Sequence, residues 1–217
     1  MSVLKERHLE RYADVLIWGL KTARRGRFRK GDAVLIQYDH AALRLVEILY
    51  DKLIAAGLNP LQRIGLSVAM ERSFFRKANG GQLVFRPPGE KELCENVHGR
   101  IFLHAPDSLT HLKDVDPARI GKAIVARKPL RDILEKREQE GVYGWTLCTL
   151  PTPELAAQAK TTPELYSDQI IRACYLDRRD PVGEWETIRR DATAIKEWLS
   201  GLKASFLHIE SERCNTF

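Results

Sequence analysis

Residues 31–57, GDAVLIQYDHAALRLVEILYDKLIAAG, place a buried strand directly before an amphipathic helix. The strand is expected over residues 33–37, which are apolar and partly β-branched. The helix is expected over residues 41–56, where apolar side chains recur at helical spacing and Gly57 provides a stop. A strand that leads into a helix is the unit of a parallel sheet, because parallel neighbours need a crossover connection.

The same alternation extends along the rest of the chain. Further strands are expected at residues 63–67, 100–104, 145–150 and 205–209. Helices are expected at residues 4–25, 68–78, 117–140 with an interruption at Pro129, 153–160, 163–176 and 181–200. Residues 79–90 contain strong breakers and are expected to form a loop with a short edge strand at 83–85. The sequence therefore predicts one α/β domain over residues 1–217, a mostly parallel sheet of about five strands with helices on both faces.

Composition and the pattern of apolar and charged residues indicate the cellular compartment of the protein. With 44% hydrophobic residues among 217, the chain can bury one ordinary core. The first 18 residues carry charges throughout, which argues against a signal peptide, and no run approaches the roughly 20 apolar residues of a membrane span. The four cysteines are widely spaced, so neither a disulfide framework nor a zinc ribbon is indicated. A reduced, cytoplasmic setting without a membrane partner is expected.

The net charge of +6 raises the question of a nucleic-acid partner. The densest basic run is RRGRFRKGD, residues 24–32, with Phe28 between the charges. Basic residues in a last helical turn are favoured by the helix dipole, and the remaining ones suit a solvated loop before a strand. Because no recognised nucleic-acid module accompanies the run, the solvated loop is the preferred interpretation and nucleic acid is not an expected partner.

Motifs that would indicate catalysis or nucleotide binding are absent from the sequence. No G-x-G-x-x-G follows the first strand, and neither a P-loop nor a G-x-S-x-G elbow occurs. The richest metal-type cluster is Glu92, Cys94, Glu95 and His98, in which Glu95 and His98 could share a helix face. Its spacing matches no zinc pattern, so a solvated helix face is preferred. His104 and His208 are interpreted as hydrogen-bonded strand histidines. No catalytic, cofactor-binding or metal-binding residue is assigned.

The order of segments resembles a known family. The segments that carry the resemblance are GWTLCTLPTPELAAQA (144–159), LYSDQIIRACYLDRRDPVGEWETI (165–188), LKASFLHI (202–209), ERYADVLIWGL (10–20), FRKGDAVLIQ (28–37), LVEILYDKLIAAG (45–57) and LTHLKDVDPARI (109–120). Together they are similar to the amino-terminal domain of the thermophilic metalloaminopeptidases of the aminopeptidase T and aminopeptidase S type. The Trp145-Thr146 strand before Pro151 and the helix that begins at Asp180-Pro181 are the most specific parts.

The resemblance implies an exopeptidase that removes amino-terminal residues from peptides with a pair of divalent metals such as zinc or cobalt. Two metals can lower the pKa of a bridging water and stabilise the tetrahedral intermediate. In relatives the metal ligands belong to a carboxy-terminal domain, so no ligand can be transferred to this sequence. The chain is therefore expected to be a fragment that forms one wall of the active-site cavity, supports a homodimer and is inactive alone.

Two other functions remain open from the residues. A free-standing flavodoxin-like module could bind a small molecule or a protein partner, since the chain can bury a complete core by itself. Nucleic-acid binding through residues 24–30 would depend on Arg24, Arg25, Arg27 and Arg29 and would weaken steeply with salt.

Overall fold

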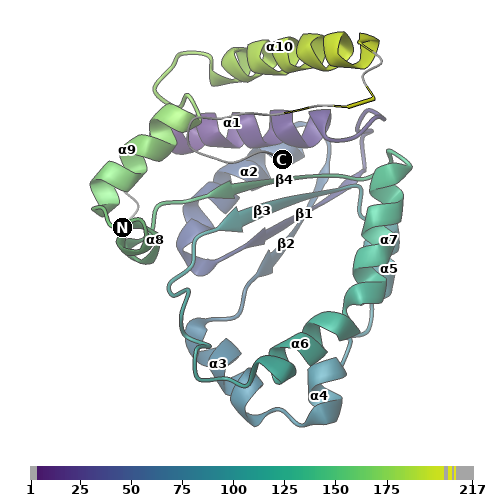
Figure 1. Ribbon diagram of the computed structural model, residues 1–217, viewed down its shortest axis with the longest axis vertical. Helices are drawn as coiled ribbons and strands as arrows, with labels where there is room; N and C mark the ends of the chain where they lie inside the picture. Colours follow the sequence, from purple (N-terminus) through teal and green to yellow (C-terminus); the bar gives the residue numbers. More distant parts are fainter. Residues whose placement is uncertain (1–3, 203–204, 207, 209–217) are drawn as a thin grey trace. The chain divides into compact units, whose positions relative to one another are not determined.

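The computed structural model describes residues 4–202, 205–206 and 208 (Figure 1). Those residues form two compact units, the first ending at Arg179 and the second beginning at Asp180. The described strands of the first unit are β1 (Ala33–Tyr38), β2 (Asn59–Ile64), β3 (Gly99–His104) and β4 (Gly144–Thr149). Its helices are α1 (Glu6–Thr22), α2 (Leu43–Ala55), α3 (Val68–Lys77), α4 (Gly80–Val84), α5 (Glu90–Asn96), α6 (Pro117–Ala126), α7 (Lys128–Gln139), α8 (Pro153–Gln158) and α9 (Pro163–Ala173), with a short 3-10 helix at His40–Ala42.

The four strands form one parallel sheet in the order β2-β1-β3-β4. This arrangement confirms the predicted α/β class with a parallel sheet. The fifth strand, expected at 205–209, includes positions 207 and 209, which lie outside the described residues. β2 begins at Asn59, earlier than the predicted 63–67. Pro60 is tolerated in it because β2 is an edge strand, where a missing backbone donor breaks no central ladder.

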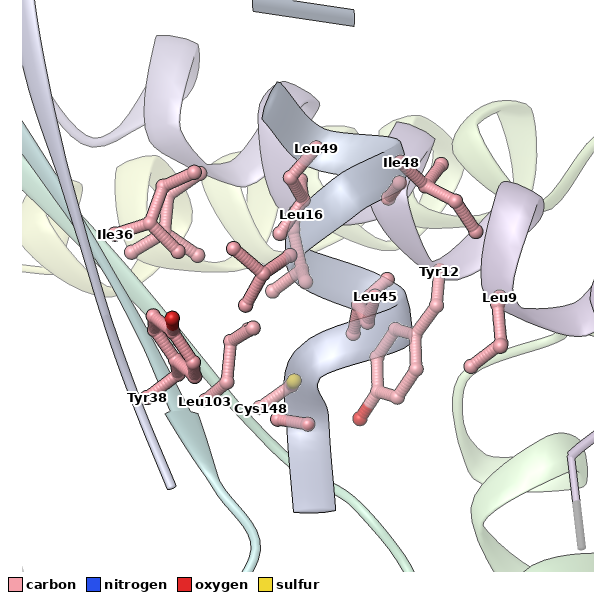
Figure 2. Close-up of a cluster of buried hydrophobic side chains, with 14 of the residues drawn as sticks. Leu9, Tyr12, Leu16, Ile36, Tyr38, Leu45, Ile48, Leu49, Leu103 and Cys148 are labelled. Carbon is pink, nitrogen blue, oxygen red and sulfur yellow. The ribbon is translucent and has the colours of Figure 1, made fainter. Parts of the chain in front are cut away.

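Successive side chains of each strand point to opposite faces of the sheet, and each face has its own helices. Ile36 of β1 and Leu103 of β3 belong to the main core with α1 and α2, and Figure 2 shows them beside Leu16 and Leu49. On the opposite face, Leu35 belongs to a small cluster with residues of α5 and α7. Helices on both faces are therefore confirmed.

A third hydrophobic cluster joins α3, α4 and α6, which Figure 1 shows gathered away from α1 and α2. The edge strand predicted at 83–85 is wrong, because residues 80–84 form α4. Asn79 and Gln82 make a capping box there: Gln82 N donates to Asn79 Oδ1 at 3.0 Å, and Asn79 N donates to Gln82 Oε1 at 2.8 Å. This reciprocal pair satisfies two backbone donors and so favours a helical turn over an extended segment.

Proline residues start several helices where the sequence predicted them. The helix expected over 117–140 is divided, since α6 ends at Ala126 and Pro129 lies in the first turn of α7. Thr162 caps α9 through its hydroxyl, which accepts from Leu165 N at 3.3 Å. Proline suits these first turns because its missing N–H would have no intrahelical partner there.

The second unit contains α10 (Pro181–Gly201), which the Asp180 carboxylate caps by accepting from Gly183 N at 3.0 Å. Its bounds confirm the helix predicted at 181–200. Among the described residues, no helix has the length and apolar character needed to cross a membrane.

Candidate functional site at the carboxyl edge of the sheet

The strand order creates a switch point between β1 and β3. From β1 the chain crosses to β2 on one side, and it then returns past β1 to β3 on the other side. The connections after β1 and β3 therefore leave the sheet in opposite directions. In doubly wound sheets ligands bind in the crevice beyond the carboxyl ends of the strands at such a point.

Two polar side chains meet at this switch point. Asp39 directly follows β1 and His104 ends β3, and Asp39 Oδ2 lies 3.5 Å from His104 Nδ1. The same oxygen accepts a hydrogen bond from Ala105 N at 2.8 Å, and Asp39 N donates to Leu103 O at 3.2 Å. Both side chains are partly exposed, His104 by 36% and Asp39 by 29%. The pair is therefore held by backbone contacts and remains accessible to a ligand.

A second histidine–carboxylate pair lies on the connections that follow β2 and β3. His111 Nε2 lies 2.8 Å from Glu71 Oε2 of α3, and His111 Nδ1 lies 3.1 Å from Ser108 O. The His111 side chain is 14% exposed. Contact with the Ser108 carbonyl at one ring nitrogen and a carboxylate at the other fixes the ring orientation.

Neither pair amounts to a hydrolytic metal centre. A catalytic metal needs about three convergent protein ligands and an open coordination position. In the part of the chain that the structure describes, no group of three or more His, Cys, Asp or Glu residues could hold a metal ion. The described residues do not fit the metal pair that the family resemblance implies, and no catalytic step can be routed through such a pair here.

The cluster Glu92, Cys94, Glu95 and His98 is dispersed in the structure. α5 ends at Asn96, so the expectation that Glu95 and His98 share a helix face is wrong. Glu95 pairs with Lys91 at 3.5 Å on the solvated side of α5, whereas Cys94 is buried. Burial raises the pKa of the Cys94 thiol, which disfavours the thiolate in the structure described.

His98 belongs to a polar network at the amino ends of the strands. Its Nδ1 accepts from Ala33 N at 3.1 Å, and its Nε2 lies 3.4 Å from Asp32 Oδ1. Asp32 Oδ2 also accepts from Arg24 Nη1 at 3.2 Å and from Arg29 N at 3.0 Å. The Arg24 and Asp32 side chains are only 8% and 11% exposed. This network connects the end of α1 to β1 and β3.

The network also bears on the basic run at residues 24–32. The Arg24 guanidinium lies 4.4 Å from the centre of the Phe28 ring and pairs with Asp32. Both contacts are within the protein, so this charge is not available to a nucleic-acid phosphate. Arg25, Arg27 and Arg29 are exposed, as the solvated-loop interpretation expects. One of the four arginines required by the nucleic-acid interpretation is therefore buried.

The buried Cys148 thiol near the carboxyl end of β4 is a poor nucleophile. Burial raises the pKa of Cys148 and of Tyr12. The Tyr12 hydroxyl donates to Thr149 O at 3.2 Å and accepts a weak bond from Cys174 Sγ at 3.6 Å. A protonated thiol is a poor nucleophile, so this group stabilises packing between α1, β4 and α9.

The Asp39–His104 pair was only half visible in the sequence. The sequence predicts a hydrogen-bonded His104 in a strand, but it indicates no partner for it. The available signal was the position of Asp39 directly after the first strand, because neighbouring parallel strands bring their carboxyl ends together. No local pattern predicts the partner of His111, because its contact with Glu71 joins residues 40 positions apart.

Comparison with known proteins adds a family match. The model of the thermophilic metalloprotease (M29) family matches residues 5–216. Among solved structures, wild-type AmpT from Thermus thermophilus resembles the chain with a TM-score of 0.60 and 20% sequence identity, over 86% of this chain and 46% of that chain. The chain thus spans about half the length of that structure, and at this identity the likeness shows the fold alone. No curated protein matches the chain.

Proposed function

Because the chain belongs to the thermophilic metalloprotease (M29) family, we propose that it is the amino-terminal, non-catalytic part of a metal-dependent aminopeptidase. That enzyme would remove amino-terminal residues from peptides in the cytoplasm. The family match over residues 5–216 carries the proposal. The dispersed carboxylates and histidines of the described residues support its non-catalytic part. Zinc, cobalt or a similar divalent pair would be bound by other residues of the complete enzyme.

The proposed role is to form one wall of the active-site cavity. Exposed apolar side chains follow the carboxyl end of the edge strand β2, where Ile64, Leu66 and Met70 are 49%, 58% and 61% exposed. Large apolar side chains exposed close together along the chain are typical of a contact region in soluble proteins. These residues support the proposal that another part of the enzyme covers the surface at the carboxyl end of β2.

The source protein provides the direct test. Mass spectrometry of the native protein is expected to find peptides of an adjacent catalytic sequence joined to these 217 residues. A native protein with the mass of this chain, 24.8 kDa, and no adjacent catalytic sequence would contradict the proposal.

We also propose that the complete enzyme is a homodimer. The strand β2 supports this, because within the described sheet it has a neighbouring strand on one side only, and Leu61 is 40% exposed. Such an edge is normally covered or blocked by charge. Sedimentation velocity of the source protein should give twice the mass of one chain, and a monomer at micromolar concentration would contradict the dimer.

A flavodoxin-like binding module remains the second candidate, because the order β2-β1-β3-β4 is that of flavodoxin-like sheets. The residues after β1, Asp39-His40-Ala41, contain no glycine that would admit a phosphate. We therefore expect flavin mononucleotide and ATP to leave the melting temperature unchanged in a thermal-shift assay. A ligand that binds only the native state raises it, so stabilisation by either compound would favour the module.

A further inference from the structure

A cavity of about 420 Å³ opens on the sheet face opposite α1 and α2. Its floor comes from alternate residues of β1, β3 and β4, namely Gln37, Arg100, Phe102, Trp145 and Leu147. In the sheet register Arg100 lies beside Trp145, and Phe102 lies between Gln37 and Leu147. Such a volume falls within the range of about 300–1,000 Å³ typical of small-molecule sites.

One face of α7 forms the wall of this cavity. Arg131, Leu134, Glu135 and Glu138 line it at helical spacing, and Tyr143 closes the end. Apolar surface is exposed on the floor, since Trp145 is 46% and Leu147 52% exposed. The cavity therefore offers an aromatic and aliphatic surface on which an apolar group can lose its contact with water.

Charges of both signs surround that apolar surface. The guanidinium of Arg100 donates to Gln37 Oε1, which holds it at the floor, and Glu138 Oε1 accepts from Trp145 Nε1 at 3.1 Å. Arg131 and Glu135, one turn apart on α7, make no ion pair or side-chain hydrogen bond with any other described residue. A cation and an anion are thus both available beside an apolar floor.

Another cavity, of about 490 Å³ beside Tyr38 and α2, offers no such pair of free charges. Its arginine, Arg44, is already bound by Glu6 and by Glu47, the latter at 2.6 Å. No cation of that cavity's lining is left for a ligand, because Arg44 is the only basic residue among those that line it in the described chain.

We propose that the α7 cavity binds a zwitterion with an apolar side chain, either a free amino acid or a very short peptide. The carboxylate would contact Arg100 and Arg131, the ammonium group would contact Glu135 and Glu138, and the side chain would lie on Phe102, Trp145 and Leu147. Charge-assisted hydrogen bonds at both ends select the zwitterion over singly charged analogues. Binding needs no metal; only the interpretation of the ligand as the released product of peptide cleavage rests on the proposed function.

Calorimetric titration of the purified chain with leucine tests this site. Saturable binding is expected for leucine, with affinity roughly tenfold weaker for leucinamide, which lacks the carboxylate, and for 4-methylpentanoate, which lacks the ammonium group. Glycine should bind more weakly than leucine because it contributes no apolar surface. Equal affinity for leucine and both analogues, or no saturable leucine binding at millimolar concentration, would overturn the proposal.

Exposed residues of α7 allow matched variants that keep the fold. Arg131→Gln should weaken leucine binding several-fold and leave leucinamide unaffected, whereas Glu135→Gln should weaken leucine and leave 4-methylpentanoate unaffected. Lys136→Gln, an exposed change on α7 outside the lining, should bind leucine normally. Leucine affinity that is unchanged in both Arg131→Gln and Glu135→Gln would refute the site. A source protein without a catalytic sequence would refute only the proposed function, since this titration uses the metal-free chain.

Discussion

The purified 217-residue chain is expected to hydrolyse no leucine anilide when cobalt, zinc or manganese is added. Hydrolysis by a metal-bound water requires several ligands fixed around an open position, and losing that centre removes many orders of magnitude in rate. Described histidines and carboxylates instead form separate pairs, Asp32 with His98, Asp39 with His104, and Glu71 with His111. Release of the coloured anilide should therefore match that of buffer containing the same metal.

This experiment has two controls. One is the addition of a chelator, and the other is the variant His98→Ala, which removes the histidine of the cluster Glu92, Cys94, Glu95 and His98. Turnover that co-purifies with the chain and disappears with chelator would contradict the expectation, and its loss in His98→Ala would place the activity at His98. Turnover that varies between preparations and is indifferent to His98→Ala would identify a contaminating peptidase. Because His98 contacts Asp32 and the backbone of β1, circular dichroism must show that His98→Ala is folded before its activity is compared.

Replacing Asp32 is expected to produce the largest loss of stability in the chain's polar network. Asp32→Asn leaves the Arg24 guanidinium buried without its counter-charge, and breaking a buried ion pair in this way costs about 3–5 kcal/mol. The substitution also weakens the contacts of Asp32 with Arg29 N and His98. Urea unfolding followed by circular dichroism would measure the difference in the free energy of unfolding.

Asp14→Asn is the matched control. Asp14 also bonds a cation, Lys52 at 2.8 Å, but its side chain is 49% exposed. Exposed pairs contribute about 0–1 kcal/mol, so this variant should unfold almost as the parent does. Equal losses for Asp32→Asn and Asp14→Asn would show that burial of the Arg24–Asp32 pair does not govern its contribution.

Local signals were sufficient for most of the fold. The strand at 33–37 and the helix at 41–56 correspond to β1 and α2 because hydrophobic spacing and Gly57 act within a few residues. Errors arose where two local signals competed. At residues 83–85 the apolar run favoured a strand, but the Asn79–Gln82 capping box and the contact of Leu83 with the α3–α6 cluster favour a helix.

The candidate site was less predictable, because its contacts join distant residues. Asp39 and His104 are 65 positions apart and Asp32 and His98 are 66 apart, so their distances depend on strand order, which hydrophobic spacing does not specify. The sequence could identify which residues end strands. It could not identify that β1 lies between β2 and β3, which brings Asp39 next to His104.

The cluster of α3, α4 and α6 has a consequence for the dynamics of the chain. It buries few large apolar side chains, and Arg119 holds it partly through bonds to backbone carbonyls, including Phe75 O at 2.6 Å. Cooperative units with little buried apolar surface open at lower free energy than the main core. We therefore expect this part of the chain, which carries the Glu71–His111 pair, to open at lower free energy than the sheet. Its amides would exchange with solvent sooner than those of β1 and β3.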